Sequence, residues 1–124
     1  MPEQPRGAPD RGLSRRQRLT RSASFAEAYA QGRKWVGRTL VLYLREGDDA
    51  SLRLGVVSSR KVGKAPYRNR ARRLIREAWR LNRHRFSGDV DVVLIARAAA
   101  ARARFSEVEE DLLRLARKAG LLKP

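Results

Sequence analysis

The chain contains no cysteine and a single histidine, His84, among its 124 residues. The absence of cysteine excludes a disulfide framework, a thiol nucleophile and a cysteine-based zinc site. No stretch approaches the roughly 18 consecutive apolar residues of a membrane span, and the first residues lack the apolar core of a signal peptide. We therefore expect a cytoplasmic protein with no membrane partner.

Acidic residues are also scarce, with 13 Asp and Glu against 29 Lys and Arg, which gives a formal net charge of +16. Such a charge favours a polyanionic partner, either nucleic acid or an anionic membrane. The hydrophobic content of 42% is that of a folded protein, and the length fits one domain. The sequence has no Ser/His/Asp set, phosphate-binding glycine loop or zinc-ligand spacing. It therefore offers binding chemistry and no visible catalytic group.

Turn and capping signals divide the chain into a tail and a domain. Residues 1–13 carry three of the five prolines and no apolar periodicity, which predicts a disordered tail before a domain at residues 14–124. The patterns predict three helices, at residues 24–31, 66–83 and 106–119, and three strands, at residues 39–44, 51–59 and 89–97. Gly32 and Gly120 supply stop signals for the outer helices.

Two S-x-x-E spacings, Ser24 with Glu27 and Ser106 with Glu109, predict capping boxes at the starts of the outer helices. In the strand at residues 39–44, alternation predicts that one set of side chains, Leu40, Leu42 and Leu44, shares a buried face. The strand at residues 89–97 is almost continuously apolar, as expected of a strand covered on both sides. Asp89 and Asp91 of this strand share a face and could be a pair of metal ligands. A role in keeping a strand edge soluble explains them better.

Most of the charge lies in residues 60–85, which hold eleven Lys and Arg and one acid, Glu77. Winding residues 66–83 into a helix gathers an apolar face of Ala71, Leu74, Ile75, Ala78 and Trp79. A second arc carries Asn69, Arg72, Arg76, Arg80 and Arg83, with Arg73 at its edge. A solvated surface helix usually mixes charge signs, whereas this arc repels itself. Because guanidinium groups donate bidentately to phosphate, the pattern predicts that the helix meets a polyanion.

Residues 60–76 resemble the signature of the bacterial ribonuclease P protein component. The resemblance rests on an R-N-R core, Arg68, Asn69 and Arg70, followed by Arg72, Arg73 and Arg76. Weaker likenesses occur in the family's order over about residues 16–122: Arg18, Leu19, Ser22 and Phe25; V-L-Y at 41–43; Gly55, Val57, Ser59, Lys61 and Gly63; and I-A-R at 95–97. The departures are Pro66-Tyr67, where the family usually has a small or aliphatic pair, Tyr29, where phenylalanine is common, and the proline-rich tail.

The resemblance implies a single-domain α/β (α+β) fold, with a mixed, mostly four-stranded sheet, three helices and a left-handed β-α-β crossover. It also implies an accessory subunit of an endoribonuclease, in which the RNA subunit is the catalyst and binds most of the Mg²⁺. The protein then has no catalytic or metal-binding residue of its own, and we expect one protein per RNA subunit.

Two sets of contact residues carry over from the family by position. The set facing the ribonuclease P RNA is Arg60, Lys61, Lys64, Arg68, Asn69, Arg70, Arg72, Arg73 and Arg76. The set facing the 5′ leader of precursor tRNA is Phe25, Tyr29, Val41 and Tyr43. From the residues alone, core packing is an open alternative for Phe25, Tyr29 and Tyr43.

Two other functions fit the same charge. One is a ribosomal or general RNA-binding protein without an enzymatic partner, which only the R-N-R signature argues against. The other is a DNA-binding protein that places the basic helix in a major groove.

Overall fold

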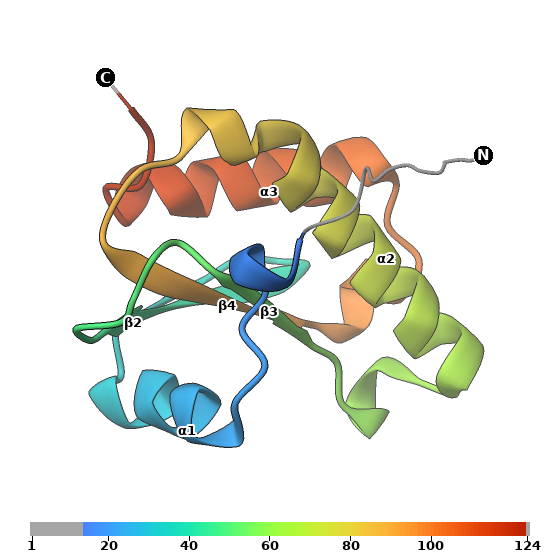
Figure 1. Cartoon of the computed structure of the whole chain (residues 1–124). Coiled ribbons are helices and arrows are strands. Elements are labelled where there is room, and N and C mark those ends of the chain that lie inside the picture. The colour runs from blue at the N-terminus through green and yellow to red at the C-terminus, as the bar shows by residue number, and fades with distance from the viewer. Residues whose placement is uncertain (1–13, 124) are drawn as a thin grey trace.

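A four-stranded mixed sheet lies between one helix on one face and two helices on the other (Figure 1). The computed structural model describes residues 14–123, so the tail predicted at residues 1–13 lies outside the described residues. The strands are β1 (Lys34–Val36), β2 (Leu40–Glu46), β3 (Leu54–Val57) and β4 (Val90–Ala96). The helices are α1 (Ser22–Gln31), α2 (Ala65–Asn82) and α3 (Phe105–Lys118), with short 3-10 turns η1 (Arg15–Gln17), η2 (Arg60–Val62), η3 (Arg83–Arg85) and η4 (Ala98–Ala101).

The strand order is β1-β2-β4-β3. β2 pairs antiparallel with both β1 and β4, whereas β3 and β4 are parallel neighbours joined through α2. This topology confirms the four-stranded mixed sheet and the β-α-β crossover implied by the resemblance; the left hand of the crossover stays a prediction. Apolar periodicity alone predicted three strands, because β1 has only three residues and too short a pattern to recognise.

The predicted alternation in β2 is confirmed. Leu40, Leu42 and Leu44 are buried beneath α2 and α3, together with Val92 and Leu94 of β4. The helices supply the other half of this core through their predicted apolar faces. On α2 these are Ala71, Ile75, Ala78 and Trp79, which are fully buried, and Leu74, which is half-buried; on α3 they are Val108, Leu112, Leu115 and Ala116. Each large side chain buried in this way contributes about 1.5–3 kcal/mol.

Both predicted capping boxes are wrong. α1 begins at Ser22, which leaves Ser24 inside the helix and buried against the domain. α3 begins at Phe105, and it is Glu107 that accepts a hydrogen bond from the Arg104 N–H, at 2.8 Å. In both cases the helix begins before the predicted capping serine, which therefore lies inside the helix and not at its N-cap. Gly32 does end α1, in the left-handed conformation with φ 68°.

The strand predicted at residues 51–59 is shorter, because pairing with β4 covers only Leu54–Val57. Leu52 just before it has φ 62°, a conformation that breaks an extended strand. Asp91 is not a strand-edge solubilising residue but is fully buried. Its carboxylate accepts hydrogen bonds from Arg45 Nη1 at 2.7 Å and Arg53 Nη2 at 2.8 Å, which explains the acid without a metal.

Candidate nucleic-acid interface

The outward-facing cations predicted to bind RNA lie on α2 and on the segment just before it. Arg73 and Arg76 are exposed on the helix, and Arg72 is half-buried and donates to Asn69 Oδ1. Just before the helix, another three of the predicted cations are exposed: Arg60, Lys61 and Lys64. Glu77 is the single acid of α2, and its carboxylate pairs with Arg80 at 2.5 Å, nearer the C-terminal end of the helix than the R-N-R core. The helix therefore presents a strongly positive surface.

Two arginines of the predicted set are turned toward the protein instead. Arg68 Nη1 donates to the carbonyl oxygen of Gly63 at 2.9 Å. Arg70 Nη1 and Nη2 donate to the carbonyls of Ala101 and Ala103, at 2.8 and 3.0 Å. These bonds occupy donors that would otherwise be free for phosphate, and they tie α2 to the loop just before it and to the segment that follows β4. Arg68 and Arg70 thus differ in placement from Arg72, Arg73 and Arg76, a distinction that the signature does not reveal.

The residues predicted to meet the leader lie on the opposite face of the sheet, around α1. Strand register places Val41 opposite Ile95 and Tyr43 opposite Val93, so these four side chains share one face. α1 covers part of this face: Ala28 packs on Val93 in a small apolar cluster that also holds Phe25, Tyr43, Val57 and Ile95 at its half-buried margin. The margin leaves apolar and aromatic surface open beside α1.

The tyrosines of this face are both packed and accessible. The rings of Tyr29 and Tyr43 meet edge to face, with centroids 5.2 Å apart, and Tyr29 is still 41% exposed. Partial burial, with a smaller contribution from Tyr43, raises the pKa of the Tyr29 hydroxyl, which stays protonated at neutral pH. Lys34 Nζ of β1 lies 6.0 Å from the Tyr43 ring centroid. A cation beside exposed aromatic rings suits a single-stranded polynucleotide.

Phe25 is positioned by a glycine. A Cβ added to Gly55 of β3 would lie 2.5 Å from Cε1 and Cζ of the Phe25 ring, so the close approach of α1 to β3 requires glycine there. A hollow of about 160 Å³ opens beside this contact, and its lining includes Phe25, Arg18 and Arg76. The structure therefore brings Phe25 of one predicted set next to Arg76 of the other.

Residues outside the two predicted sets also belong to these surfaces. Arg18 lines the hollow beside Phe25, and Lys34 lies beside Tyr43. Sequence reasoning missed Lys34 because β1 was not recognised, although alternation of a recognised strand at residues 34–36 would have placed it. His84 is exposed in η3 among the cations Arg85, Arg117 and Lys123.

The part of the chain that the structure describes contains no group of three or more His, Asp or Glu side chains able to hold a metal ion. Within the same residues, no helix is long and apolar enough to span a bilayer. What the surfaces can do chemically is bind phosphate through α2 and stack on bases beside α1.

Comparison with known proteins identifies the family. The family model for ribonuclease P matches residues 13–120. The ribonuclease P protein component of Clostridium acetobutylicum is 38% identical over 108 residues, which cover 85% of this chain and 90% of that protein. The component from Clostridioides difficile is 34% identical over 107 residues, covering 86% and 94%.

Solved structures agree with the sequence comparisons. The Staphylococcus aureus RNase P protein superposes with a TM-score of 0.76 at 26% identity, covering 86% of this chain and 98% of that one. The Thermotoga maritima protein gives a TM-score of 0.70 at 32% identity, covering 81% and 96%. A match over nearly the whole domain, in sequence and in fold, shows that this chain belongs to the ribonuclease P protein family.

Proposed function

We propose that this chain binds the ribonuclease P RNA through the exposed cations of η2 and α2, and the 5′ leader of precursor tRNA through the open sheet face beside α1. As a family member, the chain is the accessory protein subunit of an endoribonuclease that forms the 5′ end of tRNA, and its partner is the ribonuclease P RNA. We propose that the RNA subunit holds most of the Mg²⁺, that one protein binds each RNA, and that the complex works in the cytoplasm.

The observation that carries the proposal is the meeting of two chemically different surfaces at the hollow between Phe25 and Arg76. The α2 side is cationic and suits the phosphates of a large folded RNA. The α1 side is apolar and aromatic and suits the unstacked bases of a short single strand. One continuous surface can then hold the leader next to the RNA that cuts it, while the protein needs no catalytic group.

The test separates the two surfaces with Arg73→Ala and Tyr43→Ala, measured side by side in assembled holoenzyme. Arg73→Ala should weaken RNA-subunit binding and flatten the slope of log K against log salt by up to about 1, because one fewer phosphate is neutralised. Tyr43→Ala should cost about 1–3 kcal/mol in binding of precursors with long leaders. It should leave the salt slope and binding of trimmed precursors nearly unchanged.

Folding must be compared first, because Tyr43 is half-buried and loss of a packed aromatic ring can cost about 3–5 kcal/mol of stability. If folded Tyr43→Ala loses the same affinity for long and trimmed leaders, the leader assignment is wrong. If folded Arg73→Ala assembles with the RNA as wild type does, at every salt concentration, the assignment of α2 to the RNA subunit is wrong.

A further inference from the structure

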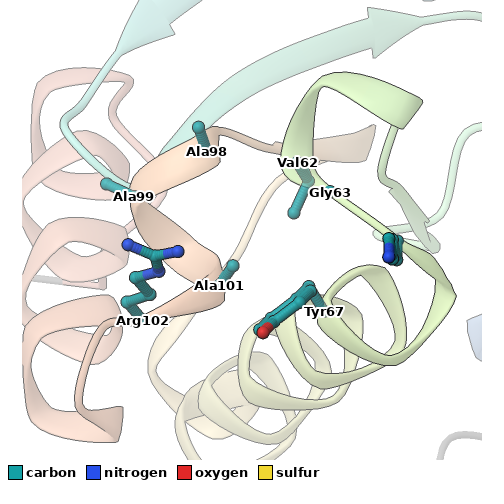
Figure 2. A pocket seen from close by; sticks show the side chains of 8 residues that line it. Val62, Gly63, Tyr67, Ala98, Ala99, Ala101 and Arg102 are labelled. Atoms are coloured by element: carbon teal, nitrogen blue, oxygen red, sulfur yellow. The ribbon is translucent and has the colours of Figure 1, made fainter.

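A second, larger hollow, of about 620 Å³, lies between the start of α2 and the η4 turn (Figure 2). Its volume falls within the range of about 300–1,000 Å³ that small-ligand sites occupy. Small side chains of η4, Ala98, Ala99 and Ala101, line one wall, and Tyr67 of α2 lies on the other. The hollow is separate from the surface beside α1, and neither of the two predicted contact sets accounts for Tyr67.

The two inward-facing arginines of the R-N-R core hold the two walls in place. Arg68 bonds to the carbonyl of Gly63 in the loop on the Tyr67 side. Arg70 bonds to the carbonyls of Ala101 and Ala103 at the end of η4, on the other side. Because charged donors fix backbone on both sides, the hollow is formed before any ligand arrives, and binding need not order its walls.

Tyr67 lines this hollow and is 45% exposed, so its aromatic ring is accessible there. Gly63 makes room for the ring: its φ is 132°, and a Cβ added there would lie 3.3 Å from the Tyr67 Cβ. Within the described residues no aromatic pair involves this ring, unlike Tyr29 with Tyr43 or Trp79 with Phe86. Tyr67 is also one of the departures from the family pattern at the start of the helix.

Two exposed cations line the same hollow as Tyr67. Lys64 lines the hollow at the start of α2, and Arg102 lines it from the end of η4, where Figure 2 shows its side chain across the gap from Tyr67. An aromatic ring and two cations around one hollow match a nucleotide, whose base can stack while its phosphates pair with the charges. A neutral molecule, or an anion without an aromatic ring, would use only part of this arrangement.

We propose that this hollow binds one unpaired RNA nucleotide, with its base stacked on Tyr67 and its flanking phosphates at Lys64 and Arg102. The inference rests on the proposed function, since it takes the RNA partner from it, and it adds a base-stacking contact to a surface otherwise described by charge. Because the hollow adjoins η2 and the exposed cations of α2, the nucleotide belongs to the RNA subunit.

The test compares Tyr67→Ala, Tyr67→Phe and Arg102→Ala with wild type in binding to the ribonuclease P RNA. Tyr67→Ala should weaken binding by about 5- to 150-fold, the loss of one stacked base. Tyr67→Phe keeps the ring and should bind within about twofold of wild type. Arg102→Ala should flatten the salt slope by up to about 1, while Tyr67→Ala leaves that slope unchanged. Leu81→Ala is the matched control, since Leu81 is on the same helix, 46% exposed and outside the hollow.

Chemical probing of ribose flexibility along the RNA supplies a second readout. One unpaired nucleotide should be protected by wild type and by Tyr67→Phe, and become reactive with Tyr67→Ala at saturating protein. Tyr67→Ala could instead leave binding to the RNA subunit intact and weaken only the binding of precursor tRNA. In that case the nucleotide belongs to the precursor, and the assignment to the RNA subunit is overturned.

If folded Tyr67→Ala matches wild type with both RNAs, the hollow holds no nucleotide. Arg73→Ala then tests the proposed function separately. If Arg73→Ala weakens assembly with the RNA subunit, the assignment of α2 to that RNA stands although the nucleotide site is refuted. If neither variant weakens assembly, both the nucleotide site and the assignment of α2 to the RNA subunit are overturned.

Discussion

Asp91→Asn tests how far the fold depends on one buried carboxylate. Asp91 is 0% exposed and accepts five hydrogen bonds. Its Oδ1 accepts from the backbone N–H groups of Ser51 and Arg53 and from Arg53 Nε, and its Oδ2 accepts from Arg45 Nη1 and Arg53 Nη2. Asparagine keeps one acceptor, but its amide NH₂ would replace the other and face guanidinium donors.

The expected loss of stability depends on which ion-pair partners the two arginines keep in Asp91→Asn. Arg45 is 5% exposed and keeps Glu27 and Asp49, at 2.7 and 2.9 Å, so the loss should fall at the lower end of the roughly 3–5 kcal/mol for breaking a buried ion pair. With a urea m-value of about 2 kcal/mol/M, about 3 kcal/mol lowers the unfolding midpoint at pH 7 by about 1.5 M. Urea unfolding followed by circular dichroism measures this shift.

The pH dependence gives an independent check of the same carboxylate. Burial alone would raise the pKa of Asp91, but hydrogen bonds from Arg53, Ser51 and Arg45 outweigh it and hold the pKa below the ordinary value of 3.8. A carboxyl with a depressed pKa stabilises the fold above its unfolded pKa and loses that contribution as the pH falls through the folded value. The stability gap between wild type and Asp91→Asn should therefore be constant above about pH 5 and narrow below about pH 4.

Asp89→Asn is the control, because Asp89 is exposed just before the same strand and should change stability by less than about 0.5 kcal/mol. A cost below about 1 kcal/mol for Asp91→Asn would refute the reasoning. So would a stability gap that stays the same from pH 7 to pH 2, since the contribution would then not come from the ionised carboxylate.

Two further substitutions probe the positions that shape the interface. Gly55→Ala should cost about 1–3 kcal/mol in stability, because the added methyl group displaces the Phe25 ring. For the same reason it should weaken the binding of long-leader precursors more than the binding of trimmed ones. A variant as stable as wild type in urea unfolding would contradict the close contact. Arg70→Ala should cost about 1.5–3 kcal/mol in stability through the lost bonds to η4, whereas Arg73→Ala should leave thermal unfolding unchanged; the opposite ranking would mean that Arg70 faces RNA and not the protein.

The sequence by itself determined the elements with long, regular patterns. The apolar stripe of α2 and the alternating leucines of β2 are confirmed because each repeats at its structural period for several turns or residues. The concentration of arginine in one helix, together with the R-N-R order, was sufficient to indicate an RNA partner and the family. These properties depend on residue type and spacing along the chain, so they need no knowledge of distant contacts.

Tertiary structure decided whatever depends on residues far apart in the sequence. The sequence suggests that Asp91 is an exposed strand-edge acid, but β2 and the loop before β3 converge on it in the fold. Asp111 lies in α3 close to three glutamates, Glu107, Glu109 and Glu110, yet its own carboxylate is buried, accepts from the Thr39 N–H at 2.8 Å and fixes the connection between β1 and β2. The sequence alone does not distinguish a charged side chain that is exposed to solvent from one that is buried against a partner.

The same reason separates the arginines of the R-N-R helix. Arg70 and Arg73 are equivalent as residue types, but η4 supplies carbonyl acceptors about 30 residues further along the chain to the first of them. Helical spacing fixes the direction in which each guanidinium leaves α2, and only the packing of η4 and the Gly63 loop decides which directions end in protein. The division of the signature into residues that hold the protein together and residues left for RNA is therefore a property of the fold.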